Sequence, residues 1–546
     1  MPPFLFWIHA MNKPSEFRFQ SFGSSDELAC LGQTPQVIYL RQYLYGLGVQ
    51  SLLIEDGYFD RDYLSEFSAF YGQSARGYSN LCKRLSFFTD PGINRAVFEQ
   101  ALKSESSSLE QLKKSFVGFT VLRPFEIAPL GRTVLAWFPE HNQDRRRITK
   151  PSRDYPIHLA GIELIVRGLA WQQQDSAVGA CATIALWSMF HASAFDDHHA
   201  IPTTAEITRS ANKKASLGAR VFPSKGLNIH QLLEAIKEQG LSPGIIEGNL
   251  DCKNISTGFQ WLGFSRERFC SGVAALIRSG YPVLLVGHHV KQDGKREVGI
   301  PGHAICAVGF RPGINEPVPN GKIAFQETNL EHIYIHDDNV GPCARFEVIS
   351  HPAQSALKSI VLKHSKPNTA PCHPEISQFP EQAIFVPEKA IVATHNEIRV
   401  SPDRLNKAAI VHGENMSLFI EMIRKNIKEE WEGFGVSVNV RYAKLIDYLG
   451  DILESTLRGE PERLGKIRLD LCEKVPPMSL HIGIIRFSVG RTSNTFMDIL
   501  IDSSDNEHFA CTSFWAHVAY HPFASILANR LHKSNKLIIN YLVEAF

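Results

Sequence analysis

A cysteine at the start of an expected helix could act as a nucleophile. Cys181 follows a turn that contains Gly179 and opens the small-residue, apolar run 181–189, which predicts a helix. In the first turn of a helix the unsatisfied backbone amides favour a thiolate. A thiolate is a strong nucleophile, so Cys181 could attack a carbonyl carbon. Taken alone, however, a cysteine in an apolar helix is more often a small buried hydrophobe.

A histidine that could act as the base follows later in the chain. His303 comes directly after Gly302 and before the apolar run 304–310, which predicts a strand with the histidine at its start. The glycine leaves room for another group to approach closely. An imidazole in this position can accept the thiol proton and later protonate a leaving group.

Acidic and amide side chains at the end of the next expected strand could hold that imidazole. The strand at 332–336 is followed by Asp337, Asp338 and Asn339. Such a group fixes the tautomer and orientation of a catalytic histidine. We expect Asp337 in this role, with Asp338 second and Asn339 third.

Three consecutive glutamines precede the cysteine and could stabilise an oxyanion. A side-chain amide that folds back toward the nucleophile can act together with the backbone N–H of Cys181. The sequence offers Gln172, Gln173 and Gln174, and we favour Gln174, with Gln173 next.

Metal and cofactor sites are not expected. The pair His288-His289 has no carboxylate or thiol partner nearby in sequence. The spacing of His303 and Cys306 occurs in zinc sites, but residues three apart on a strand face opposite sides. No phosphate-binding G-x-x-x-x-G-K-[ST] pattern and no G-x-S-x-G pattern is present.

The elements that must position these residues suggest a multidomain α+β protein. In the central part, helices are expected at 181–189, after the Thr203-x-x-Glu206 capping box and at 227–239, followed by antiparallel strands. We expect an N-terminal α/β domain at 1–165, the central domain at 166–365, a proline-rich linker at 366–389 and a C-terminal α/β domain at 390–546.

Charge and cysteine usage narrow the partners and the compartment. The 57 basic and 56 acidic side chains leave a net charge of +1, which favours neither a nucleic-acid partner nor an acidic membrane surface. No apolar run reaches the roughly 18 residues of a spanning helix. The ten cysteines are spread thinly without a C-x-x-C pair, so we expect a reducing cytoplasm.

Glutamine, then Gly-x-Cys at a helix start, then Gly-His-Ala before a strand and an aspartate after the next strand together resemble the papain-like cysteine peptidase superfamily. Over about residues 171–346 the pattern is most similar to the bacteriocin-processing peptidases. Gly-Ala-Cys-Ala stands where these usually have Cys-Gly. The resemblance implies a central papain-like domain with Cys181, His303, Asp337 and Gln174 as catalytic residues and no cofactor.

Three functions fit this pattern. The resemblance favours a thiol peptidase acting on a peptide or protein. An acyltransferase would use the same triad with an amine as acceptor. A non-catalytic interaction module on a papain-like scaffold would retain the fold without an activated thiol. The roles of the flanking domains do not follow from the sequence.

Overall fold

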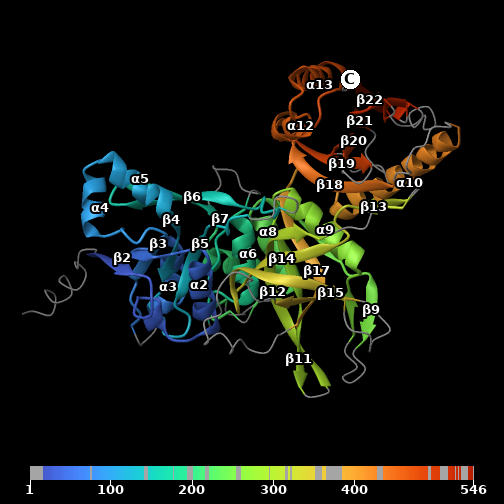
Figure 1. Cartoon of the computed structure of the whole chain (residues 1–546). Helices are drawn as coiled ribbons and strands as arrows, with labels where there is room; N and C mark the ends of the chain where they lie inside the picture. Colours follow the sequence, from blue (N-terminus) through green and yellow to red (C-terminus); the bar gives the residue numbers. More distant parts are fainter. Residues whose placement is uncertain are drawn as a thin grey trace, which may run out of the picture.

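The computed structural model of the protein (Figure 1) has the predicted α+β class, with helices and several β-sheets. It describes residues 16–73, 77–140, 146–175, 177–192, 201–214, 221–224, 226–253, 260–293, 296–313, 318–319, 322–350, 359–364, 384–426, 435–489, 494–504, 514–522, 524–526, 528–529 and 539–544.

The N-terminal part forms a five-stranded antiparallel sheet whose spatial order follows the sequence, β1-β2-β3-β4-β5. The branched and aromatic run at 116–122 is strand β4. The carboxylate of Asp60 caps α3 by accepting a hydrogen bond from the amide of Tyr63 at 3.0 Å. The elements are β1 (Glu16–Ser21), η1 (Ala29–Leu31), α2 (Pro35–Gly46), β2 (Ser51–Tyr58), α3 (Arg61–Ala69), η2 (Tyr71–Gln73), β3 (Cys82–Phe88), α4 (Arg95–Leu102), α5 (Ser106–Ser115), β4 (Phe116–Leu122) and β5 (Leu130–Leu135).

The central part combines helices with an antiparallel sheet that closes on itself. Strand β11 pairs with β12 along one edge and with β17 along the other, so six strands form a ring in the order β11-β12-β14-β15-β16-β17, and β8 adds to β17. The expected helix at 181–189 and the Thr203–Glu206 capping box are both confirmed. The elements are β6 (Arg153–Leu159), β7 (Ile162–Gly168), α6 (Cys181–Phe190), α7 (Thr204–Ala211), α8 (Ile229–Glu238), β8 (Leu241–Glu247), β9 (Leu250–Lys253), β10 (Gln260–Gly263), α9 (Arg266–Arg278), β11 (Val283–Asp293), β12 (Arg296–Pro312), β14 (Leu330–Asp337), β15 (Gly341–Ser350), β16 (Ile360–His364) and β17 (Ile384–His395).

Two expected domain boundaries fall inside strands. Strand β7 spans the boundary at 165, and β17 spans the one at 389, at the end of the proposed linker. Pro387 lies opposite Gly287 at an irregularity of the β11–β17 pairing, where the missing N–H of proline is tolerated. Residues 366–383 of that linker lie outside the described residues.

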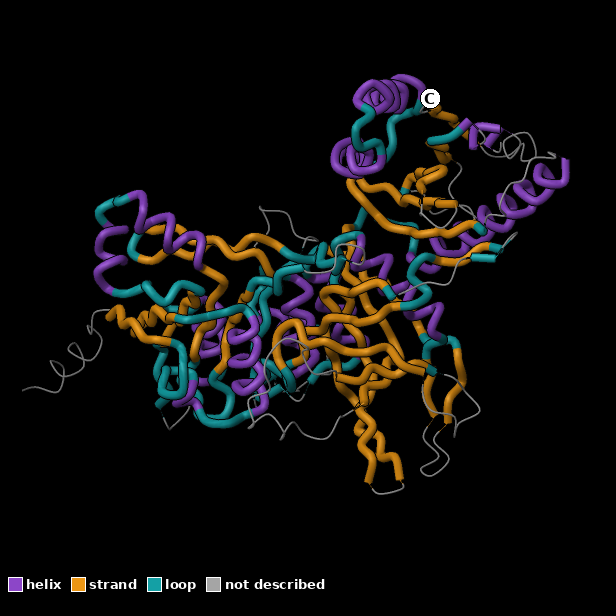
Figure 2. Tube along the Cα trace, in the orientation of Figure 1, coloured by secondary structure: helices purple, strands orange, loops and turns teal. Residues whose placement is uncertain are grey.

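The C-terminal part is built on a six-stranded sheet in the order β13-β18-β19-β20-β21-β22. Its edge strand β13 comes from the segment between β12 and β14 and pairs parallel with β18. In Figure 2 this part adjoins one end of the central strands, while the β11–β12 hairpin extends away at the other. The elements are β13 (Ile323–Phe325), α10 (Pro402–Asn426), β18 (Val436–Lys444), α11 (Leu445–Asp447), η4 (Tyr448–Ile452), α12 (Leu453–Thr456), α13 (Pro461–Lys474), β19 (His481–Val489), β20 (Asn494–Asp502), β21 (Phe514–Ala519) and β22 (Ile539–Glu544).

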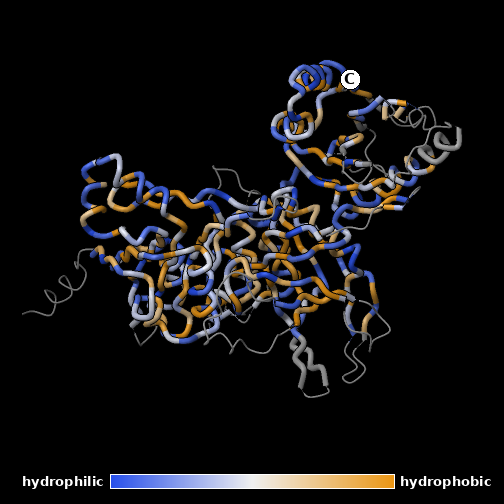
Figure 3. Tube along the Cα trace, viewed as in Figure 1, coloured by the Kyte–Doolittle hydropathy of each residue, from blue (hydrophilic) through white to orange (hydrophobic). Residues whose placement is uncertain are grey.

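One apolar core runs through the N-terminal sheet, the central ring and one face of the C-terminal sheet. A second core, which includes Tyr448, Ile484 and Leu500, fills the opposite face of the C-terminal sheet beneath α13. Figure 3 shows apolar residues gathered along the inner strands and hydrophilic residues on outer helices such as α13. Within the described ranges, no helix has both the length and the apolar character needed to cross a membrane.

Candidate active site

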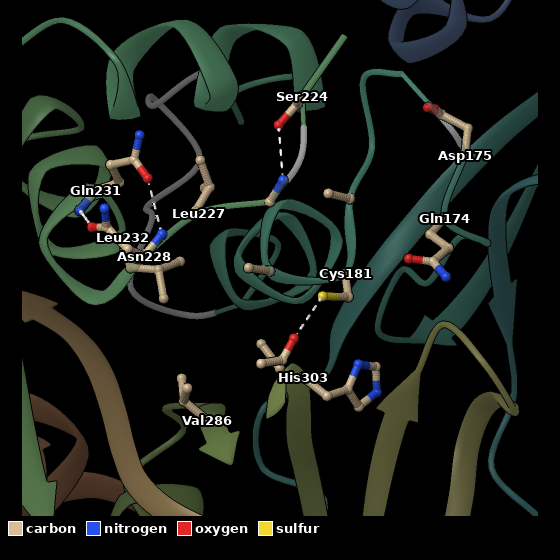
Figure 4. Close-up of a pocket in the computed structure, with 15 residues that line it drawn as sticks. Gln174, Asp175, Cys181, Ser224, Leu227, Asn228, Gln231, Leu232, Val286 and His303 are labelled. Carbon is tan, nitrogen blue, oxygen red and sulfur yellow. Dashed lines mark hydrogen bonds between the residues drawn. The ribbon is translucent and has the colours of Figure 1, made fainter. Parts of the chain in front are cut away.

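Cys181 is the first residue of α6, and its side chain is partly exposed in a cleft (Figure 4). The N-cap residue Ala180 has extended backbone angles and offers no side chain to cap the helix. The first amides of α6 therefore have no side-chain acceptor at the N-cap, and the positive end of the helix lies at the residue that carries the thiol. The Sγ atom lies 4.0 Å from the carbonyl oxygen of Gly302. The remaining residues of α6 are buried, which fixes the helix against the sheet.

The turn before the cysteine is held by a single carboxylate. Asp175 accepts hydrogen bonds from the backbone amides of Ala177 at 2.7 Å, Val178 at 2.6 Å and Gly179 at 3.1 Å. A Cβ at position 179 would lie 2.9 Å from the side chain of Ile184 and 3.1 Å from Asp175. A larger residue here would have to displace the end of the Ile184 side chain, so glycine suits the close approach of this turn to α6.

The N-terminal part braces this turn through a buried ionic network. The guanidinium of Arg123 on the loop after β4 lies 3.1 Å from Glu66 and 3.6 Å from Asp175, and all three side chains are almost fully buried. Burial raises the pKa of Glu66 to about 7, against the opposing attraction of Arg123. Thr204 at the start of α7 also donates a hydrogen bond to Glu66 at 2.7 Å. The N-terminal sheet thus contributes directly to the position of the nucleophile.

The three candidate glutamines have different surroundings. The side-chain amide of Gln172 donates to Glu66 at 3.0 Å, and the side chain of Gln173 accepts from a backbone amide of β5 at 3.3 Å. Both are buried against the N-terminal part. Gln174 alone of the three lines the cleft with Cys181, and its amide lies 3.4 Å from the Oδ1 atom of Asn339. This placement favours Gln174 as the oxyanion donor.

His303 on β12 lies beside Cys181 and is almost fully buried. Its Nε2 atom faces the end of β14, at 3.2 Å from Asp337, 3.3 Å from Asn339 and 3.6 Å from Asp338. The other ring nitrogen, Nδ1, is therefore left for the thiol. Burial favours the neutral ring, but the charge of Asp337 and hydrogen bonds to Asp337 and Cys181 raise the pKa of His303 well above its usual value.

The two adjacent aspartates differ in their support. Burial disfavours the charge of Asp337, but the attraction of His303 and a 2.9 Å hydrogen bond from the amide of Asn339 keep its pKa below the usual value. Burial, together with the neighbouring charge of Asp337, raises the pKa of Asp338 to about 7, although His303 acts in the opposite sense. Neither oxygen of Asp338 makes a hydrogen bond to a described residue. Asp337 is thus the better orienting group.

The histidine pair on β11 has partners that its sequence neighbourhood did not reveal. His288 forms a 2.7 Å contact with Glu388 of β17. The ring of His289 lies 4.6 Å from that of His303, and ligand atoms of His289, His303 and Asp337 all lie within 4.8 Å of one another. These three could hold a metal ion, which was not expected from the sequence. The succession of β11 and β12 was the available signal, because these strands form a hairpin.

The cleft has a volume of about 660 Å³ and brings Gln174, Cys181 and His303 to one surface. The segment before α8 contributes Leu227 and Asn228 to the opposite wall, and α8 itself contributes Gln231 and Leu232. A thiol, an imidazole with a carboxylate partner and a side-chain amide therefore converge on a space large enough for a small molecule or a peptide segment. This arrangement can support acyl transfer from an amide or ester.

Comparison with known proteins yields no match, either among protein-family models or among curated protein sequences.

Proposed function

We propose that this protein is a cysteine-dependent hydrolase that cleaves amide bonds, with peptides or proteins as substrates. The observation that carries the proposal is the position of Cys181 at the start of α6, beside a buried His303 whose Nε2 atom contacts Asp337 at 3.2 Å. Gln174 lines the same cleft. Cys181, His303 and Asp337 come from different elements of the chain, on α6, β12 and β14, so the fold rather than the local sequence brings them together.

The reaction begins when the Cys181 thiolate attacks the carbonyl carbon of the substrate and forms a C–S bond. The oxyanion of the tetrahedral intermediate accepts hydrogen bonds from the Cys181 amide and the Gln174 side chain. Imidazolium at His303 then donates its proton to the leaving amine as the C–N bond breaks. Asp337 stabilises the positive ring throughout, which is the physical meaning of its effect on the pKa of His303.

The resulting thioester is resolved by water. Neutral His303 removes a proton from the water molecule, the hydroxide attacks the thioester, and the carboxylic acid leaves as the C–S bond breaks and the thiolate is restored. An amine in place of water would give acyl transfer with the same groups. Peptide bonds are favoured as the substrate class by the resemblance to papain-like peptidases.

The first test is the rate of iodoacetamide alkylation at pH 6, measured for each cysteine by mass spectrometry. An ordinary thiol is ionised to only about one part in 300 at this pH. Cys181 should react much faster than the exposed Cys30 and Cys472, which serve as internal references. His303→Ala should slow Cys181 by about 100-fold and leave the two references unchanged. Equal rates at Cys181 and Cys472 in the wild-type protein would contradict the proposal.

The second test concerns turnover. A complex peptide mixture is incubated with the wild-type chain or with Cys181→Ala, and new peptide termini are identified by mass spectrometry. Cleavage should depend on Cys181, because loss of a nucleophile typically costs several orders of magnitude. Added hydroxylamine separates the alternatives, since an acyltransferase would yield hydroxamates in preference to free acids. An activated Cys181 that yields neither product would argue against both reactions.

A further inference from the structure

A second cavity, of about 480 Å³, lies where the N-terminal, central and C-terminal parts of the chain meet. Its walls come from the segment before β6, the end of α9, strand β18 and the helical segment after it. Five basic side chains and two acidic ones line it, with two histidines: Lys150, Arg167, Arg278, Arg441, Lys444, Asp447, Asp451, His395 and His481. The lining side chains are therefore mostly basic, although Arg167 is paired with Asp154 at 3.1 Å outside the cavity wall.

Arg441 is the cation that most needs a partner. Its Nε atom is fully buried and makes no hydrogen bond to a described residue, and no carboxylate of the described chain lies within ion-pair distance of its guanidinium. Burial, with repulsion from Arg486, lowers the pKa of Arg441 to about 10, so the side chain still carries its charge at neutral pH. Burying an unpaired charge is costly, and native proteins seldom do so without a compensating group.

Asp498, the carboxylate near Arg441, is already hydrogen-bonded to other side chains. Asp498 accepts two hydrogen bonds from Arg486, at 2.8 and 2.7 Å, and further ones from the hydroxyls of Tyr448 and Tyr520 at 3.0 and 2.8 Å. Arg441 lies diagonally across the β18–β19 ladder from Arg486, because Arg441 pairs with Ile484. The hydrogen bonds of this carboxylate therefore go to one of two neighbouring guanidiniums, and the second has no ion pair with a described residue, although the charge of Asp498 still favours its protonated form.

A third guanidinium faces the same cavity. Arg278 at the end of α9 contacts Glu327 through one terminal nitrogen, while its Nε atom is buried without a hydrogen bond to a described residue. The terminal nitrogens of Arg441 and the second terminal nitrogen of Arg278 make no hydrogen bond to a described residue, and together with the lysines at the rim they match the several oxygen atoms of a phosphate group. The stacked rings of His395 and His481, with centroids 4.5 Å apart, add a flat wall to a space of small-molecule size.

We propose that this cavity binds a phosphate-bearing small molecule of about the size of a mononucleotide, with Arg441 and Arg278 contacting the phosphate. The site is separate from the cleft that contains Cys181, and the inference does not depend on the proposed hydrolase activity. The ligand would supply the negative charge that the buried cluster lacks.

Isothermal titration calorimetry of the full chain at low salt tests this proposal, with adenosine monophosphate, inorganic phosphate and adenosine as separate probes. Adenosine monophosphate should bind and adenosine should not. Binding of inorganic phosphate alone with equal affinity would assign the site to the phosphoryl group by itself. Binding of adenosine with the affinity of the monophosphate, or no binding of either phosphate probe, would overturn the proposal.

Two variants locate the binding. Arg441→Met should weaken binding at least tenfold, whereas Arg458→Met, an exposed arginine of the same part of the chain that does not line the cavity, should not change it. Arg441→Met should also preserve or raise the melting temperature of the ligand-free chain, because it removes an unpaired buried charge. Lys444→Met at the exposed rim does not endanger folding and should weaken binding about threefold. Unchanged affinity in Lys444→Met and Arg441→Met would overturn the proposal.

Discussion

The cleft of the central part and the core of the C-terminal sheet each bury a small group of charged side chains, and the two groups differ in the sign of their excess charge. In the cleft, His303 faces two carboxylates, Asp337 at 3.2 Å and Asp338 at 3.6 Å. The histidine can bear one positive charge, so the second carboxylate has no counter-charge. It responds by holding its proton up to a pH of about 7.

The C-terminal group has the opposite composition. Arg441 and Arg486 share a neighbourhood with one carboxylate, Asp498, which pairs with Arg486 in two hydrogen bonds. An arginine cannot discharge itself near neutral pH. The excess charge therefore stays on Arg441, for which no described residue supplies a paired carboxylate.

This contrast teaches how a buried excess charge relates to function. An excess charge on a group that titrates near neutrality can be relieved by binding a proton. An excess charge on an arginine cannot be relieved in this way, and we propose that a ligand supplies the counter-charge. The predictions below alter one member of each group at a time.

The largest effect is expected at Asp337. Asp337→Ala removes both the charge and the acceptor that hold His303, and we expect the alkylation rate of Cys181 at pH 6 to fall by about 100-fold. Asp337→Asn keeps an oxygen acceptor and should recover part of the rate. Asp338→Asn should change it less than threefold. Equal losses in Asp337→Ala and Asp338→Asn would contradict the assignment of Asp337 as the orienting group.

In the C-terminal group the paired arginine should matter most for stability. Arg486→Met leaves the buried Asp498 without its partner and should cost about 3–5 kcal/mol in the free energy of unfolding. Arg441→Met should cost little or raise stability. Urea-induced unfolding followed by circular dichroism compares the two variants, and Arg458→Met serves as the exposed control. A larger loss of unfolding free energy in Arg441→Met than in Arg486→Met would contradict the assignment of Asp498 as the partner of Arg486.

The pH dependence of stability provides a test of Asp338. Its pKa is about 7 in the folded chain and about 3.8 as a free side chain. The folded state therefore binds more protons than the unfolded state between these values, and the contribution of this group to stability falls as pH rises through them. Asp338→Asn removes this decline, so the variant should gain roughly 2 kcal/mol relative to wild type between pH 5 and pH 8. Parallel stability curves for the two proteins would exclude a buried proton at Asp338.

The smallest effect concerns His289. Zinc bound by His289, His303 and Asp337 would occupy the catalytic base, so micromolar Zn²⁺ should slow alkylation of Cys181 at pH 7. In His289→Ala, at least a tenfold higher Zn²⁺ concentration should be needed to slow the alkylation of Cys181 to the same extent. Because zinc also binds free thiols, inhibition of both proteins at equal concentrations would mean that His289 has no part in it.

Much of the candidate site could be predicted because Cys181 and Asp337 stand at the ends of local elements. The expectation that His303 stands at the start of its strand was wrong, because β12 begins at Arg296 and pairs with β11 on both sides of the histidine. The helix at Cys181, the strand that carries His303 and the strand that ends at Asp337 each have a short apolar pattern that depends on near neighbours. Of the glutamines, Gln174, which was preferred as the oxyanion donor, is the one that lines the cleft. The sequence did not show why Gln172 is excluded from the cleft. Its side-chain amide donates a hydrogen bond to Glu66, which lies more than 100 residues earlier in the chain.

Other features could not be predicted from short patterns. The proposed linker was placed up to residue 389, yet β17 begins at Ile384 and closes the central ring by pairing with β11. Prolines in that segment suggested an extended connection, and Pro387 is accommodated at an irregular position of the ladder. Whether such a segment forms a strand depends on its pairing with strands far apart in the chain. Local composition does not show that pairing.

The sequence by itself determined the α+β class, the helix that begins at Cys181 and the order of nucleophile, base and acid along the chain, because helix starts and strand ends depend on side chains a few residues away. Only the tertiary structure decided that β17 belongs to the central ring, that His289 lies against His303 and that Arg441 is buried beside an occupied Asp498. Those features depend on which distant strands pair and which charges are buried together, and neither is encoded in the spacing of neighbouring residues.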